Sequence, residues 1–111
     1  MGPLAGHNAS MTIFAVHYVY DSRTDIRDRV RPEHRRYLAG LLEAGVLLAS
    51  GPFTGPTEGG GPEEPDGALL ILRGESAADV TAALDTDPFA LADVVAERTV
   101  RPWQPVMGPW A

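Results

Sequence analysis

The sequence predicts an α+β domain in which four strands form an antiparallel sheet and two helices cover one of its faces. Three observations support this prediction. A nearly continuous apolar and β-branched run begins the patterned part of the chain, two later segments repeat apolar residues at helical spacing, and segments rich in glycine and proline separate these elements. The 111 residues are enough for one domain with a single core.

The first half of the chain predicts a strand, a helix and a second strand. Residues 12–20 are almost all apolar, aromatic or β-branched, which is typical of a strand that is covered on both faces. Pro32 is suited to the first position of a helix over residues 31–44, and Gly45 is suited to the position just after its end. The short apolar run at 46–49 predicts the second strand. The apolar face of the helix comprises Tyr37, Leu38, Leu41 and Leu42.

The second half predicts a strand, a helix and a last strand after a long loop. Residues 51–66 hold too many glycines and prolines for regular structure, and we expect them to form a lid over a site. Residues 67–73 predict the third strand, 76–86 the second helix and 96–101 the fourth strand. The inward face of the second helix comprises Val80, Ala83 and Leu84.

The resulting order, β-α-β-β-α-β, is that of the ferredoxin-like fold. Both helices lie on one face of such a sheet, and its strands here lack the polar alternation that an exposed face would need. We therefore expect the other face to meet the sheet of a second copy, so that a homodimer forms an α/β barrel.

Composition excludes several classes of partner and site. With 9 basic and 15 acidic residues the net charge is −6, which disfavours nucleic acid and anionic membranes as partners. The sequence has no cysteine, so disulfides and cysteine-based metal sites are excluded.

Residues 1–11 are interpreted as a flexible leader or a remnant of expression, and 12–111 as the domain. No signal peptide or membrane-spanning run is found, so we expect a cytoplasmic location.

Helical spacing indicates that two polar residues point inward. His34 continues the apolar face of the first helix at its first turn, and Asp87 continues that of the second helix at its last turn. Because the helices run antiparallel, these two ends lie at the same edge of the sheet. The helix dipoles disfavour a charged form at both positions, and pairing would relieve both. The spacing therefore predicts a His34–Asp87 acid/base dyad, although both residues could simply bond to backbone and close the core.

Three further residues are candidates for substrate binding, each with a plain structural alternative. Ser50 lies at the same edge but could be a turn residue, and Arg31 could be a solvated residue at a helix start. His17 could face the interior of the barrel, or it could pack within its strand. The three histidines lack the spacing of metal ligands, so we expect no metal site.

The chain resembles the YciI-like (YCII-related) domain family over about residues 12–107. The resemblance lies in the ordered segments Arg31-Pro-Glu-His34, Leu47-Leu-Ala-Ser-Gly-Pro52, Asp66-Gly-Ala-Leu-Leu-Ile-Leu72, Asp87-Pro-Phe89 and Val100-Arg-Pro-Trp103. It implies a ferredoxin-like fold, a dimeric α/β barrel and a His-Asp active site at His34 and Asp87. One branch of the family resembles dehydrochlorinases of chlorinated hydroxyquinols, and wider relatives include muconolactone isomerases and cofactor-free monooxygenases. The longer loop at 53–65 departs from the family pattern.

Two functions remain open on the sequence alone. The first is a cofactor-independent lyase or isomerase that acts on a small, cyclic or phenolic molecule. In it His34 moves a proton, Asp87 orients it, and Arg31 or Ser50 holds an anionic oxygen. The second is a small-ligand-binding or accessory module without chemistry. They differ in whether His34 and Asp87 meet at the wall of an open cavity.

Overall fold

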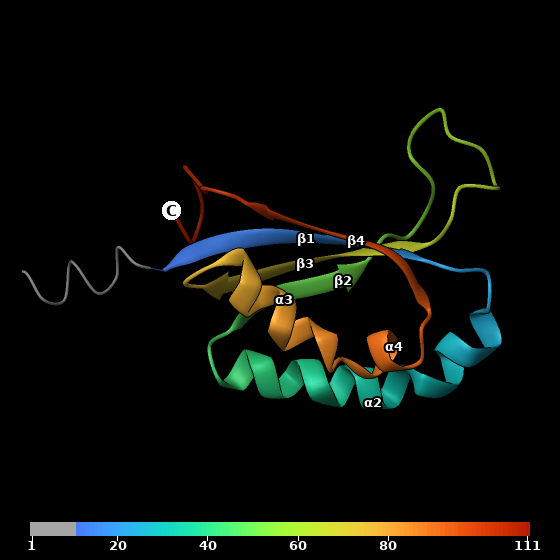
Figure 1. Ribbon diagram of the computed structural model, residues 1–111. Coiled ribbons are helices and arrows are strands. Elements are labelled where there is room, and N and C mark those ends of the chain that lie inside the picture. The colour runs from blue at the N-terminus through green and yellow to red at the C-terminus, as the bar shows by residue number, and fades with distance from the viewer. Residues whose placement is uncertain (1–10) are drawn as a thin grey trace, which may run out of the picture.

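A computed structural model describes residues 11–111, and residues 1–10 of the leader predicted at 1–11 lie outside them. The elements follow the predicted order, with one short helix added before the last strand (Figure 1). They are β1 (Thr12–Tyr20), α2 (Thr24–Glu43), β2 (Leu47–Pro52), β3 (Gly67–Gly74), α3 (Ala77–Asp85), α4 (Pro88–Leu91) and β4 (Val95–Pro102).

The four strands form one antiparallel sheet in the order β2-β3-β1-β4, and the helices cover one of its faces (Figure 1). The core lies between the sheet and the helices. Side chains from the two central strands meet those of α3 there, and the most deeply buried apolar ones are Val16, Tyr18, Leu70, Leu72, Val80, Leu84 and Val94. The fold class is therefore the predicted ferredoxin-like α+β arrangement.

Helix α2 begins seven residues earlier than predicted, so Pro32 lies within it. The prediction was wrong because a proline was interpreted as the first helical residue. Here the proline is exposed, and the carbonyl that loses its partner can be hydrated. Ile26 and Val30 pack against the core and extend the apolar face through the added turns. The end of the helix follows the prediction, because Gly45 adopts a positive φ of 80°.

Strand β2 also extends beyond its predicted end. Ser50, Gly51 and Pro52 pair with Leu70, Leu69 and Ala68 of β3. A proline is tolerated here because β2 is an edge strand, with one side free of a ladder. This extension carries Ser50 along the sheet toward the end at which β1 finishes and α2 begins.

The second face of the sheet carries no helix (Figure 1). His17 and its register partner Leu69 both lie on this open face and are exposed, while their neighbours on the other face belong to the core. The expectation that β1 is covered on both faces is therefore not met within one chain. Among residues 11–111, no helix is long and apolar enough to cross a membrane.

Candidate active site

The structure brings His34 and Asp87 together across 53 positions of sequence. The Nδ1 atom of His34 lies 2.7 Å from Oδ1 of Asp87. Asp87 is fully buried and His34 is 9% exposed. The spatial prediction from helical spacing thus agrees with the geometry.

The spacing predicted Asp87 in the last turn of the second helix, and this placement was wrong. That helix ends at Asp85, and Asp87 is the N-cap of the short helix α4, where its Oδ1 accepts from the backbone N–H of Phe89 at 3.0 Å. His34 likewise lies in the interior of α2 rather than in its first turn. The helix dipoles therefore do not disfavour the charged forms as expected, because an N-cap favours a carboxylate.

The hydrogen bonds of Asp87 assign its charge and the tautomer of His34. Its carboxyl group accepts from the backbone N–H of Phe89 and from the hydroxyl of Tyr18 at 2.9 Å from Oδ2, and Nδ1 of His34 is the third group within hydrogen-bond distance. An ionised carboxylate can accept from all three groups, whereas a protonated carboxyl group would place its own hydrogen against one of them. Nδ1 then carries the hydrogen, and the neutral ring keeps Nε2 as its unprotonated nitrogen.

Tyr18 is a positioning residue that the sequence analysis missed. Burial, and then the negative charge and hydrogen bond of Asp87, raise the pKa of Tyr18 far above its ordinary value. The hydroxyl therefore stays protonated and donates to Asp87 throughout the range in which proteins work. A tyrosine two residues from the end of an apolar strand gives no sequence signal of this contact.

The ring of Phe89 fixes the plane of the His34 imidazole. The two rings stack with centroids 3.8 Å apart and an angle of 5° between their planes. Phe89 is itself buried against Tyr20, with an edge-to-face contact at 5.5 Å. The bond to Asp87 and this stacking together leave the imidazole one orientation, which is the requirement for directed proton transfer.

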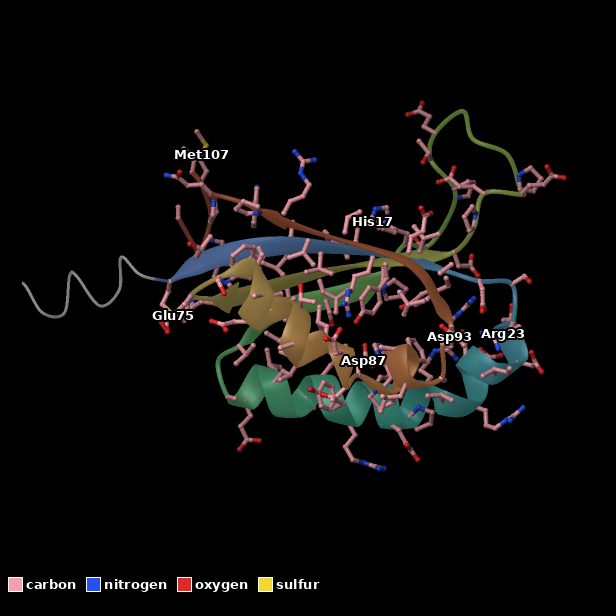
Figure 2. All side chains as sticks on the ribbon, viewed as in Figure 1. His17, Arg23, Glu75, Asp87, Asp93 and Met107 are labelled. Atoms are coloured by element: carbon pink, nitrogen blue, oxygen red, sulfur yellow. The ribbon has the colours of Figure 1, made fainter. Side chains whose placement is uncertain are left out.

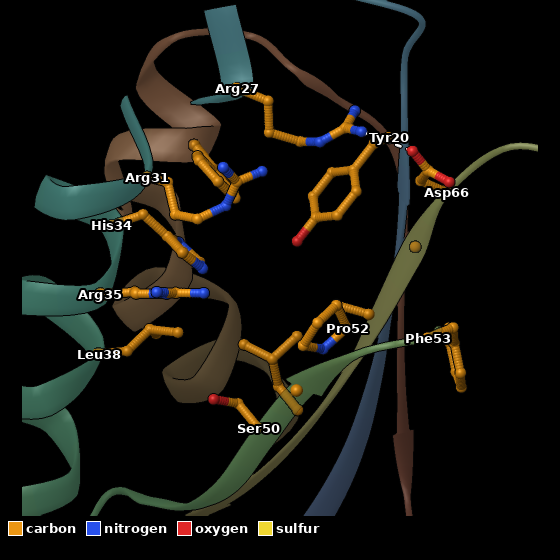
Figure 3. Close-up of a pocket in the computed structure, with 15 residues that line it drawn as sticks. Tyr20, Arg27, Arg31, His34, Arg35, Leu38, Ser50, Pro52, Phe53 and Asp66 are labelled. Carbon is orange, nitrogen blue, oxygen red and sulfur yellow. Dashed lines mark hydrogen bonds and ion pairs between the residues drawn. The ribbon is translucent and has the colours of Figure 1, made fainter. Parts of the chain in front are cut away.

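His34 lies on the wall of a cavity of about 550 Å³, a size typical of small-molecule sites. Figure 3 shows α2 on one side of it, β2 and β3 on the other, and the hydroxyl end of Tyr20 pointing into the space. The cavity is lined by Tyr20, Arg27, Arg31, His34, Arg35, Leu38, Ser50, Gly51, Pro52, Phe53, Asp66, Gly67, Ala68, Leu70 and Phe89.

Two predicted binding residues, Arg31 and Ser50, line this cavity. Arg31 is half-buried, and its Nη1 lies 2.7 Å from Oδ1 of Asp28 on the same helix. Ser50 is exposed on β2, opposite α2 (Figure 3). Both can therefore reach a molecule that contacts His34.

Arg27 holds the end of the cavity that lies nearest the start of α2, and the sequence analysis did not single it out. Arg27 is only 4% exposed, and its guanidinium donates to Oδ2 of Asp66 at 2.7 Å and to the carbonyl of Asp21 and lies 4.7 Å from the ring centre of Tyr20. Arg27 lies on α2, Asp21 directly follows β1, and Asp66 directly precedes β3, so these bonds join three parts of the chain. The spacing of Arg27, Arg31 and Arg35 at four-residue intervals was the available signal.

His17 does not join His34. It lies on the open face of the sheet, whereas Asp87 lies on the helix side (Figure 2). There its ring contacts Phe53 edge-on at 5.4 Å and lines a second cavity together with Val19 and most of the 53–66 loop. Of the predicted 51–66 loop, Gly51, Pro52 and Phe53 at one end and Asp66 at the other line the cavity of His34, and residues 54–65 do not. The loop is therefore not the lid that we expected.

Within the described residues, no three histidine, aspartate or glutamate side chains gather so that they could hold a metal ion. The polar groups that face the cavity are instead an imidazole, three guanidiniums, two hydroxyls and one carboxylate. Such a set can accept and return a proton and can bind an anionic oxygen.

Comparison with solved structures gives similar folds that carry several activities. The 5-chloro-2-hydroxyhydroquinone dehydrochlorinase of Burkholderia phenoliruptrix AC1100, solved with 2,5-dihydroxybenzoquinone, is 25% identical with a TM-score of 0.67, over 83% of this chain and 93% of that one. The hydroxynitrile lyase of Passiflora edulis is 15% identical with a TM-score of 0.51, over 89% of this chain and 97% of that one, and shows the fold alone.

None of the curated proteins matches the sequence. The profile of one family does match it, over residues 11–104, and the match includes both members of the His34–Asp87 pair. This span covers nearly all of the described structure, from the start of β1 to just beyond the end of β4. The chain therefore belongs to the YCII-related domain family.

Proposed function

We propose that the cavity carries out acid/base chemistry on a small cyclic or phenolic molecule, with His34 as the proton-transferring group. The observation that carries the proposal is the His34–Asp87 hydrogen bond of 2.7 Å at the wall of an open cavity. A pair that served only to close the core would have no such space beside it. This distinction also favours an enzyme over a binding module.

The roles follow from the geometry of the pair. His34 takes a proton at Nε2 from a ring C–H or O–H group, and Asp87 holds Nδ1–H and stabilises the imidazolium that forms. In an elimination the leaving group departs with its bonding electron pair, and in an isomerisation the proton returns to another carbon. Either reaction moves protons without net oxidation, so the proposal needs no cofactor. Arg31 and Ser50 are proposed to hold an anionic oxygen of the substrate.

The similarity to the dehydrochlorinase favours the lyase branch of this chemistry. That protein was solved with a dihydroxylated quinone, and its identity to this chain is 25% over most of both chains. We therefore place chlorinated hydroxyquinols first among the substrates to test, followed by other phenols and by lactones.

We further propose that two copies pair through the open face of the sheet, on which Leu69 is exposed. A face that carries exposed apolar side chains and no helix is suited to such a contact. The cytoplasmic location also stays a prediction of the sequence.

The test compares turnover, and proton exchange in deuterated water, for the parent, His34→Ala and Asp87→Asn. We expect His34→Ala to lower the rate by about 10²- to 10⁴-fold, because general acid/base groups typically contribute that much. Asp87→Asn is expected to lower it at least about tenfold, because the amide no longer stabilises the imidazolium. Asp85→Asn is the matched control, since Asp85 is exposed and pairs with Arg98 outside the cavity. Parent rates in folded His34→Ala or Asp87→Asn protein would refute the proposal.

A further inference from the structure

The lining of the cavity is rich in arginine, in a protein whose net charge is negative. Arg27, Arg31 and Arg35 follow one another at four-residue intervals, so they form a stripe along the face of α2 that lines the cavity. His34 lies within this stripe. Among residues 11–111, Asp66 is the one carboxylate in the lining, whereas the net charge of the chain is −6.

The three guanidiniums are engaged to different degrees. Arg27 is buried and its charge is paired with Asp66, which leaves the two together nearly neutral. Arg31 uses Nη1 for Asp28, an exposed residue, and its other guanidinium nitrogen atoms make no hydrogen bond within residues 11–111. Arg35 has no ion pair or hydrogen bond to any residue in the described part of the chain. Arg31 is thus paired with Asp28, which lies outside the lining, and keeps nitrogen atoms free to donate, whereas Arg35 has no carboxylate partner within residues 11–111.

These two arginines lie on either side of His34 along the helix. Figure 3 shows Arg31, His34 and Arg35 projecting from α2 toward the same space, with Tyr20 and Ser50 across from them. A guanidinium presents a planar set of donors that fits two oxygen atoms of one anionic group. An anionic group bound by these two arginines would lie beside His34. The atom that gives its proton to Nε2 then belongs to another part of the same ligand.

We propose that the substrate carries an anionic oxygen group in addition to its reacting centre, and that Arg31 and Arg35 bind this group. The inference rests on the proposed function for the role of His34, and it adds the chemical class of the substrate. The ligand is a ring of about the size of benzoate, bearing a carboxylate or an ionised phenol. A cavity of about 550 Å³ accommodates a single ring with its substituents.

Binding of simple probes tests this proposal without knowledge of the natural substrate. Affinities are measured by calorimetry for two pairs, each with an anion and a neutral molecule of similar shape: benzoate with benzamide, and 4-nitrophenolate with 4-nitroanisole at mildly alkaline pH. We expect at least one anion to bind the parent about tenfold or more tightly than its neutral counterpart, and the pair with the larger ratio identifies carboxylate or phenolate as the group recognised. Equal affinities within both pairs would overturn the proposal.

Variants that remove one positive charge test whether anion binding depends on these two arginines or on the net charge of the molecule. Arg31→Gln and Arg35→Gln should each weaken binding of the preferred anion by about three- to tenfold, and the double variant by more. Neither should change binding of the neutral probe. Arg36→Gln is the matched control, because Arg36 follows Arg35 on the helix and is exposed as Arg35 is, but does not line the cavity. An equal loss in Arg36→Gln would show a general charge effect and overturn the inference.

The failure of this inference is distinguishable from that of the proposed function. His34→Ala should lower turnover by about 10²- to 10⁴-fold yet keep the preference for the anion, because proton transfer and anion binding use different groups. Turnover that depends on His34, without any anion preference, would refute the arginine site alone. An anion preference that depends on Arg31 and Arg35, with turnover unaffected by His34→Ala, would refute the dyad alone.

Discussion

At the residue scale, the three donors around Asp87 make its surroundings sensitive to single atoms. Removing the hydroxyl in Tyr18→Phe leaves Oδ2 of a fully buried carboxylate without its partner. We expect the free energy of unfolding to fall by about 1–3 kcal/mol, since an unsatisfied buried polar group costs that much. Urea denaturation followed by circular dichroism measures the change.

Tyr20→Phe is the control for this prediction. Tyr20 lies two residues away on the same face of β1, but its hydroxyl makes no hydrogen bond within residues 11–111 and points into the cavity (Figure 3). The same substitution there should change the free energy of unfolding by less than about 0.5 kcal/mol. Equal losses in the two variants would contradict the role given to the Tyr18 hydroxyl.

Tyr20 also has a predicted effect on stability at high pH. Burial, and then the negative charge of Asp87, raise its pKa to about 12, against an ordinary value of 10.0. Between these two values the unfolded chain has lost the proton that the folded chain keeps. The stability of the parent therefore falls as pH rises from about 10 to about 12, and Tyr20→Phe should lose less over that range.

Tyrosinate absorbance measures this titration directly. The difference between the parent and Tyr20→Phe gives the curve of the one residue, with an expected midpoint near 12. A midpoint at the ordinary value of tyrosine would show that the ring is hydrated and that Asp87 does not affect it.

At the element scale, Gly67 lies at a close approach of β3 to β1 beside the cavity. A Cβ atom placed there would lie 2.5 Å from the carbonyl oxygen of Tyr18, which is backbone and cannot rotate away. Gly67→Ala should lower the free energy of unfolding by about 1–3 kcal/mol, as overpacking does. Gly51→Ala is the control, because a Cβ at Gly51 meets nothing within 4 Å. Thermal unfolding of both variants checks the prediction, and similar melting temperatures would contradict it.

The elements that the sequence predicted well are those with a strong local pattern. The boundaries of β1 match the prediction, and Ser76, where the second helix was predicted to begin, caps α3 with its hydroxyl accepting from the backbone N–H of Asp79. The start of α2 was misplaced because a single proline outweighed the weaker apolar signal of Ile26 and Val30. A proline inside a helix leaves one backbone carbonyl without its partner, which is tolerated where the proline faces solvent. The sequence alone does not show that Pro32 is exposed.

In the site, too, the parts that were predicted are those that a local pattern determines, and the parts that were missed depend on contacts between distant segments. Helical spacing predicted that His34 faces inward, and chain direction predicted that Asp87 lies beside it. The contacts of Tyr18 and Phe89 depend on how α4 packs against α2 and β1, which no local pattern records. His17 was left open between the interior of a barrel and packing within its strand; strand alternation places it on the open face, opposite to Tyr18, so it does not reach His34.

At the scale of the whole molecule, the open face of the sheet determines how the chain is expected to associate. Its centre is largely apolar, and a stable contact between two proteins buries about 800 Å² on each partner, which a face of this kind can supply. In a symmetric dimer each copy offers the same patch, so a residue near the axis meets its own equivalent. The side chains on this face include Ala15, His17, Val19, Leu69 and Ile71.

Leu69→Glu tests this arrangement. Leu69 is 40% exposed on β3, and a glutamate there would place two like charges close together in a symmetric pair while removing apolar contact. We expect the parent to sediment as a dimer at micromolar concentration and Leu69→Glu to raise the dissociation constant by about 10²-fold or more. Leu91→Glu is the control, because Leu91 is 70% exposed on α4, on the helix side. A monomeric parent, or equal effects of the two variants, would contradict the dimer. Because His34, Asp87, Arg31 and Arg35 all come from one chain, the folded Leu69→Glu monomer should still prefer the anion.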